Sequence, residues 1–144
     1  MIKIDTSELD QFTVEISNLS DKTKDNVQKV LNNTGFDIEA QAKINLDRNK
    51  SVITGHLRRG ITTKIGNMEV TVHTSNIKYA PMVEFGTKPH IIKPKNKKAL
   101  YWKGAKHPVK IVKHKGSRAK PYLIPAFENT KDNFIKDLEE VIEW

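Results

Sequence analysis

The chain has 144 residues, of which 37% are hydrophobic and 29% charged, and a net charge of +8; this suits one domain over residues 1–144. It contains no cysteine, which excludes disulfide bonds and cysteine-based zinc sites. No stretch approaches the ~18 apolar residues of a membrane helix, and the first residues lack the apolar part of a secretory signal, so synthesis in the cytoplasm is expected.

Two helices are expected before residue 50. The first, over residues 6–19, has apolar side chains at spacings of three and four, namely Leu9, Phe12, Ile16 and Leu19. Ser20 suits the N-cap of a second, longer helix that ends near residues 47–49. The apolar stripe of this helix comprises Val27, Val30, Leu31, Thr34, Ile38, Ala42 and Leu46. Gly35 interrupts the stripe and is expected to weaken or bend the helix.

A β-hairpin is predicted over residues 61–74, after a loop at 50–60 with one helical turn capped by Thr54. Two segments in which apolar and polar residues alternate flank Gly66-Asn67, a pair typical of two-residue hairpin loops. The predicted register places Ile65 opposite Met68, Thr63 opposite Val70, Ile61 opposite Val72, and Lys64 opposite Glu69. One face of the hairpin is then apolar and the other polar.

An extended basic β-ribbon is expected over about residues 88–120. It follows a short helix or turn at 78–87 that Gly86 closes. Its strands are expected at 90–93, 98–103 and 109–113.

The ribbon concentrates the positive charge of the chain, because no acidic residue occurs between Phe85 and Phe127. This stretch carries twelve cations: Lys88, Lys93, Lys95, Lys97, Lys98, Lys103, Lys106, Lys110, Lys113, Lys115, Arg118 and Lys120. Taking twelve from +8 leaves −4 for the rest of the chain, so the charge is strongly polarised.

A last helix is expected from Pro125, which suits the first helical position, to the C-terminus. Its buried face comprises Ala126, Phe127, Thr130, Phe134, Leu138, Val141 and Ile142. The predicted fold class is α+β: two N-terminal helices and a long C-terminal helix pack on a mainly antiparallel sheet, from which the basic β-ribbon extends.

Three segments carry a resemblance to a known family. Tyr79-Ala80-Pro81-Met82-Val83-Glu84-Phe85-Gly86-Thr87 is similar to a signature written YA..vEfGT, and Ala119-Lys120-Pro121-Tyr122-Leu123-Ile124-Pro125-Ala126-Phe127 to a segment written..PFL.PA. Thr54-Gly55-His56-Leu57-Arg58 is similar to TG.L..S, except that Gly60 stands near the place of the serine. In chain order, with the helix, hairpin, signature, ribbon and last helix following one another over roughly residues 25–144, the segments resemble the head–tail joining and tail-completion family of tailed bacteriophages, also described as minor tail or neck components.

The resemblance implies a structural virion protein of the phage neck, with no catalytic residue, cofactor or metal. Such a protein forms a ring, of about six copies, that joins the head connector or adaptor to the tail tube or tail terminator. The motif residues carried over as determinants of folding or assembly are Tyr79, Pro81, Glu84, Phe85, Gly86, Thr87, Pro121, Leu123 and Pro125.

Two interpretations of the signature remain open. In the favoured one it is a tight packing corner with Tyr79, Val83 and Phe85 buried. In the other, Glu84 pairs with a cation of this chain or of a neighbouring subunit. Gly86 is expected to adopt a positive φ in either case.

The basic ribbon has three interpretations. It is a solvated surface, or a wall that contacts genomic DNA in the channel without sequence specificity, or a docking element for an acidic patch. Residues 128–144, with six acids and two lysines, favour the docking element slightly. The expected contact surface comprises Lys93, Lys95, Lys97, Lys98, Lys103, Lys106, Lys110, Lys113, Lys115, Arg118 and Lys120. Tyr101 and Trp102 suit base stacking, but packing of one of them on the core side is favoured.

No enzyme motif is visible. The five histidines show no metal-binding spacing, and there is no nucleophile elbow, phosphate-binding loop or pair of catalytic carboxylates. A nuclease or toxin function is therefore not supported, because the chain offers no set of metal ligands or nucleophiles for it. The alternative kept beside the phage protein is a small basic nucleic-acid-binding module, and no membrane partner is expected.

Overall fold

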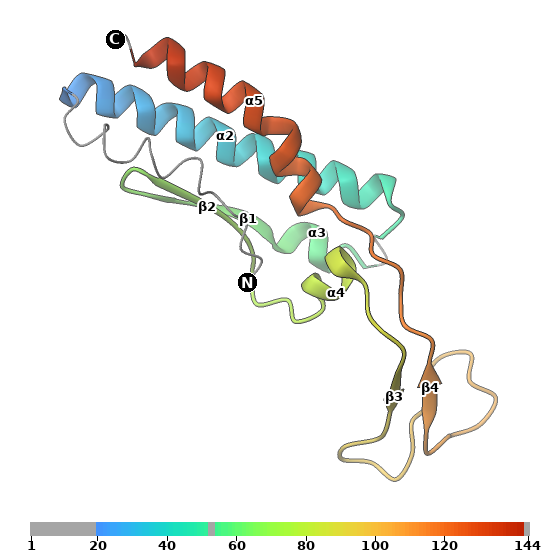
Figure 1. Ribbon diagram of the computed structural model, residues 1–144. Coiled ribbons are helices and arrows are strands. Elements are labelled where there is room, and N and C mark those ends of the chain that lie inside the picture. Colours follow the sequence, from blue (N-terminus) through green and yellow to red (C-terminus); the bar gives the residue numbers. More distant parts are fainter. Residues whose placement is uncertain (1–19, 52–53, 143–144) are drawn as a thin grey trace.

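Figure 1 shows the computed structural model, which describes residues 20–51 and 54–142. The helix expected over residues 6–19 lies outside these ranges. Within them the fold is α+β, with four helices and two small antiparallel sheets. The long helices α2 (Asp21–Arg48) and α5 (Leu123–Val141) run side by side in opposite directions. None of the helices in this part of the chain is long and apolar enough to span a membrane.

Helix α2 begins and ends as predicted. The Ser20 hydroxyl accepts the backbone N–H of Thr23 at 3.3 Å, and Asn49 is the C-cap. The predicted stripe faces inward, with Val27, Ile38, Ala42 and Leu46 buried. Each buried Leu or Ile contributes on the order of 1.5–3 kcal/mol, so packing rather than intrinsic propensity stabilises this helix.

Gly35 does not break α2, which is continuous through it. The residue is buried under the hairpin, and a Cβ there would overlap the side chain of Val70 and lie 2.8 Å from Cγ2 of Thr63. The Thr63 hydroxyl also hydrogen-bonds the Gly35 carbonyl oxygen at 3.0 Å. Glycine is therefore present for close approach of helix and strand, a role that the helix pattern alone did not reveal.

The hairpin consists of β1 (Ile61–Gly66) and β2 (Glu69–Thr74), as predicted, but the predicted register is wrong by two residues. Ile65 pairs with Val70, Thr63 with Val72, Ile61 with Thr74, and Lys64 with Thr71. The loop is Asn67-Met68 rather than Gly66-Asn67, and Met68 has a φ of 54°. The Met68 N–H donates to Gln28 Oε1 at 2.6 Å, which ties the loop to α2. A shift of two keeps each side chain on its predicted face.

Two short helices connect the hairpin to the rest. Helix α3 (His56–Gly60) is the predicted helical turn; its N-cap is Gly55, with a φ of 71°, rather than Thr54. The Thr54 hydroxyl still accepts the His56 N–H at 3.4 Å. Helix α4 (Ala80–Phe85) ends at Gly86, whose φ of 74° confirms the predicted positive value.

The core lies between α2, α5 and the short helices, in two parts. At the start of α2, Val27 packs with Phe134, Leu138 and Ile142, as the predicted face of the last helix requires. The larger part contains Ile38, Ala42, Leu46, Leu57, Ile61, Ile77, Ala80, Tyr122, Leu123 and Ala126. No residue between 81 and 121 belongs to the fully buried apolar set of the described chain.

Residues 88–120, which we name the arm, project from one end of the molecule (Figure 1). Strands β3 (His90–Ile92) and β4 (Val112–His114) pair over three residues, and isolated bridges join Leu100 to Val109 and Thr87 to Ser117. The strand expected at 98–103 is absent apart from the Leu100 bridge. This sheet is separate from the hairpin, so the single mainly antiparallel sheet that was predicted is two small sheets. Neither strand of the β3–β4 pair has a buried face, and none of the described helices covers it.

Candidate functional site

The two longer motifs meet at Glu84, although 31 residues, 88–118, separate them in the chain. Its side chain is 1% exposed. The two carboxylate oxygens accept backbone N–H groups from Tyr122 at 2.8 Å, Leu123 at 3.0 Å and Ile124 at 3.0 Å. Glu84 therefore binds the N-terminus of α5, where the positive end of the helix dipole also favours a negative charge. Neither interpretation of the signature expected this partner, which is the backbone of the same chain rather than a cation.

This geometry explains where α5 begins. The first N–H groups of a helix have no partner within the helix. Glu84 accepts those of Tyr122, Leu123 and Ile124, and Pro125, the third helical residue, has none to offer. The helix thus starts two residues before the predicted position, because a carboxylate from elsewhere in the chain satisfies the additional donors.

Tyr122, the N-cap of α5, is fully buried. Its carbonyl oxygen accepts a hydrogen bond from Asn45 Nδ2 at 3.0 Å, and the carbonyl of Pro121 accepts one from Asn49 Nδ2 at 2.8 Å. Within the described ranges the Tyr122 hydroxyl has no hydrogen-bond partner. Burial, the charge of Glu84 and the neighbouring Tyr79 raise the pKa of Tyr122. No sequence pattern pointed to Asn45 or Asn49, because their partners lie more than 70 residues further along the chain.

Helix α4 presents its aromatic residues outward. Ala80 and Glu84, four residues apart, share the buried face. Tyr79 and Phe85 are consequently exposed, the latter by 58%, while Val83 is half-buried. The expectation that Tyr79, Val83 and Phe85 fill a packing corner was therefore wrong for the two aromatics, because the inward position belongs to the carboxylate.

The base of the arm is held by backbone contacts. Thr87 and Ser117 exchange N–H···O bonds of 2.9 and 3.1 Å, and the Lys120 N–H donates to the Val83 carbonyl at 2.8 Å. A Cβ at Gly86 would lie 2.5 Å from the Ser117 carbonyl oxygen and 2.7 Å from the Ala119 nitrogen. Gly86 thus allows the chain entering the arm to touch the chain leaving it.

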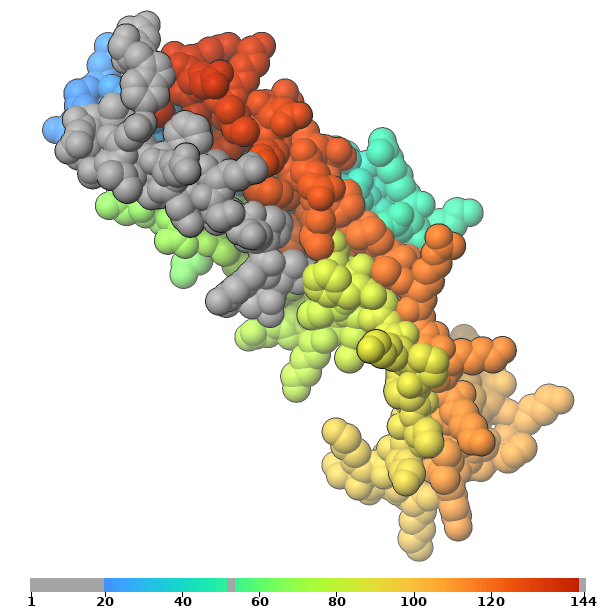
Figure 2. Space-filling model, viewed as in Figure 1, coloured from blue at the N-terminus to red at the C-terminus, as the bar shows by residue number. Residues whose placement is uncertain are grey.

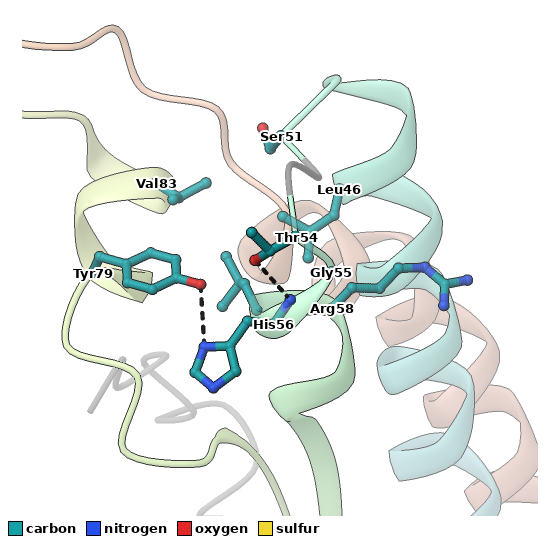
Figure 3. A pocket seen from close by; sticks show the side chains of 9 residues that line it. Leu46, Ser51, Thr54, Gly55, His56, Arg58, Tyr79 and Val83 are labelled. Carbon is teal, nitrogen blue, oxygen red and sulfur yellow. Dashed lines mark hydrogen bonds between the residues drawn. The ribbon is translucent and has the colours of Figure 1, made fainter. Parts of the chain in front are cut away.

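The third motif lines a pocket of about 360 Å³ beside α4. Figure 3 shows Tyr79 and Val83 facing residues of α3 and the end of α2 across it, with the Tyr79 hydroxyl directed at His56. Tyr79 Oη and His56 Nδ1 lie 3.4 Å apart. The pocket is mainly apolar, with Arg58 at its side. Arg58 Nε donates a hydrogen bond to Asp47 Oδ2 at 3.1 Å. All three motifs therefore gather where the arm leaves the body.

The arm itself is a solvent-exposed basic surface, and Figure 2 shows it as a narrow extension. All twelve cations between Lys88 and Lys120 are exposed. Exposed apolar side chains lie among them: Ile91, Ile92, Tyr101, Trp102 and Ile111. Tyr101 and Trp102 are 69% and 50% exposed, so the expectation that one is packed was wrong. That expectation assumed a core side, which an isolated ribbon does not have.

Groups of three or more potential metal ligands do not occur within residues 20–51 and 54–142. His90 and His114 face each other across the β3–β4 ribbon with ring centroids 4.9 Å apart. The site is therefore one of packing, charge and exposed apolar surface.

Comparison with protein families finds a match over residues 10–86 to the family described as "Bacteriophage HK97-gp10, putative tail-component". The match covers more than half of the chain. The chain belongs to this HK97-gp10 family. No curated protein and no solved structure gives a significant match.

Membership of the HK97-gp10 family confirms the predicted resemblance at the level of a phage tail component, and so a virion protein. The matched region contains α2, the hairpin and the signature as far as Gly86. The arm and α5 follow the matched region.

Proposed function

We propose that this HK97-gp10 family member completes the tail at the phage neck. About six copies would form a ring between the head connector or adaptor and the tail tube or tail terminator. The helices and hairpin would form the wall of the ring, and the arm would reach a neighbouring subunit or ring. Genomic DNA would pass through the channel without sequence-specific contacts.

The exposed arm is the observation that carries this proposal. It contributes nothing to the buried core, yet hydrogen bonds to Val83 of α4 and to Thr87 hold its base. It combines twelve exposed cations with five exposed large apolar residues. Protein interfaces combine an apolar centre with a polar rim in this way, whereas a surface that only confers solubility needs no exposed Trp or Ile.

Complementation of a phage that lacks this gene tests the proposal. A variant carrying Lys95→Glu, Lys97→Glu and Lys98→Glu should fold normally but leave heads and tails unjoined under the electron microscope. The matched control reverses three exposed cations outside the arm, Lys22, Lys29 and Lys64, and should join heads to tails. Normal infectious particles with the arm variant, or a protein missing from the neck of mature virions, would contradict the proposal.

A second candidate, a basic nucleic-acid-binding module, is favoured by Tyr101 and Trp102 standing exposed among lysines. It predicts a salt-dependent shift of random DNA in a gel, weakened by Tyr101→Ser with Trp102→Ser. The tail-completion proposal predicts failed joining with that variant even where DNA binding is unchanged.

A further inference from the structure

The arm has a complement in charge on the same molecule. The exposed side chains of α5 include five acids, Glu128, Asp132, Asp137, Glu139 and Glu140, and one cation, Lys136. Glu128, Asp132 and Glu139 are spaced by four and seven residues, which places them on one outward stripe opposite the buried face. We name these three residues the acidic stripe.

No ion pair between described residues uses either charged surface. Across residues 20–51 and 54–142, the ion pairs join Lys24 to Asp21, Lys43 to Glu39, and Arg58 to Asp47. The twelve cations of the arm and the three acids of the stripe are all exposed.

The arrangement of the two surfaces keeps a copy from pairing with itself. The arm leaves the body at the start of α5 and points away from it, while α5 runs to the opposite end of the molecule (Figure 1). The space-filling view shows the same separation between the tip of the arm and the far part of α5 (Figure 2). The stripe runs along α5, whereas the arm points away from α5, so the contact would be between two unlike surfaces. Such a contact is heterologous, and repeated contacts of this kind close into a ring or continue as a filament.

We infer that the arm of one copy docks on the acidic stripe of α5 in the next copy. This rests on the proposed function, since it supplies the contact between subunits of the ring. Arm lysines face the carboxylates and fix the orientation, because complementary charges steer encounter and register more than they add affinity. The exposed apolar residues of the arm, Trp102 and Ile111 among them, provide the buried centre that such an interface needs.

Site-directed cross-linking tests the contact directly, because the natural chain has no cysteine. Purified Lys97→Cys and Asp132→Cys proteins are mixed and treated with a short bifunctional thiol reagent. A heterodimer on a denaturing gel is expected, and high salt should reduce it because the attraction is screened. Glu69→Cys, an exposed acid on the hairpin, replaces Asp132→Cys in the control mixture. A yield no higher than in that control overturns the inference.

Charge exchange gives an independent test. For this experiment the arm cysteine is placed at Asn96 and the stripe cysteine at Asn129, both exposed positions that the charge changes leave alone. The arm variant with Lys95→Glu, Lys97→Glu and Lys98→Glu should lose the cross-link, and so should a stripe variant with Glu128→Lys, Asp132→Lys and Glu139→Lys. One chain carrying both sets of changes should regain it. Failure of the double variant to regain the cross-link overturns the docking.

The two proposals fail differently in phage complementation. If the arm variant blocks joining and the double variant does not restore it, the arm contacts another virion component, and only the docking inference is lost. If the arm variant joins heads to tails normally, the proposed function is lost. Restoration of joining by the double variant supports both.

Discussion

At the residue scale, Glu84 makes the contact that joins α4 to the start of α5. A buried carboxylate is unfavourable unless hydrogen bonds replace its water, and here three backbone N–H groups do so. The same bonds satisfy the start of α5. Glu84 therefore fixes the position at which the last helix begins and, with it, the chain that leaves the arm.

Glu84→Gln is expected to lower the free energy of unfolding by about 2–3 kcal/mol, because the neutral amide replaces one acceptor with a donor that faces N–H groups. Urea denaturation followed by circular dichroism measures the change. Glu140→Gln makes the same chemical change at an exposed position of α5 and should alter stability by less than about 0.5 kcal/mol. Equal effects of the two substitutions would contradict the role assigned to Glu84.

Gly86→Ala is expected to cost about 2–4 kcal/mol, since a left-handed conformation is unfavourable for alanine and its Cβ would meet the backbone of residues 117–119. Gly104→Ala separates the two causes. Gly104 also has a positive φ, of 100°, but a Cβ there would meet nothing within 4 Å. Its substitution should cost only about 1 kcal/mol in thermal or urea unfolding. If Gly104→Ala is as costly as Gly86→Ala, crowding at the base of the arm is not the cause.

For these two residues the sequence predicted a local backbone conformation but not the contacts made with distant parts of the chain. Gly86 was expected to take a positive φ, and it does, because a short helix followed by glycine is a local pattern. The partner of Glu84 lies 38 to 40 residues away, and no local pattern reveals it. The exposure of Tyr79 and Phe85 follows from that partner, so it was missed for the same reason.

At the scale of elements, the hairpin is fastened to α2 through a glycine and a carboxylate. The Thr63 hydroxyl hydrogen-bonds the Gly35 carbonyl and the Glu39 carboxylate. The Met68 N–H donates to the Gln28 side chain. The tether at Met68 places the loop one residue later than the Gly-Asn pattern predicts. Strand positions and faces were thus predictable from alternation, while the register required a contact with another element.

Gly35→Ala should destabilise the protein, by about 1–3 kcal/mol, although alanine normally stabilises a helix relative to glycine by about 1 kcal/mol. The reversal of sign follows from the overlap of a Cβ with Val70 and Thr63. Asn33→Ala, at an exposed site two residues earlier in α2, should be neutral or slightly stabilising. A higher melting temperature for Gly35→Ala would show that the hairpin does not lie against this residue.

The Glu39 carboxylate should make stability depend on acidity. Burial acts to raise its pKa, but hydrogen bonds from Lys43 and Thr63 and the charge of Lys43 together hold the pKa below its usual value of 4.5. A lowered folded-state pKa gives stability that is present above the usual pKa and is lost as the pH falls through the folded value. The stability difference between the wild type and Glu39→Gln should therefore shrink as the pH falls from about 5 to about 3. In a Lys43→Met background the pH dependence should be weaker, and an unchanged dependence would contradict this cause.

At the scale of the whole molecule, the protein divides into a packed body and an unpacked arm. The α+β class and the two long helices were predictable because their apolar periodicity is long and regular. The division into two sheets was not predictable, since the two sheets have different environments. The hairpin packs on α2, whereas the β3–β4 ribbon is exposed to solvent. The run of twelve cations without an acid was the sequence signal that this segment stays outside the core.

Removing most of the arm should leave the body intact. Replacing residues 93–111 by Asn-Gly joins Ile92 to Val112 through a two-residue loop and keeps the β3–β4 pairing. Because no fully buried apolar residue lies between 81 and 121, stability should change by less than about 1 kcal/mol in urea unfolding. The shortened protein should nevertheless fail to join heads to tails, whereas a full-length arm carrying Lys→Arg changes at residues 95, 97 and 98 should succeed because its charge is retained. A shortened protein that no longer folds would place the arm within the cooperative unit, and one that supports infection would remove the arm from the assembly mechanism.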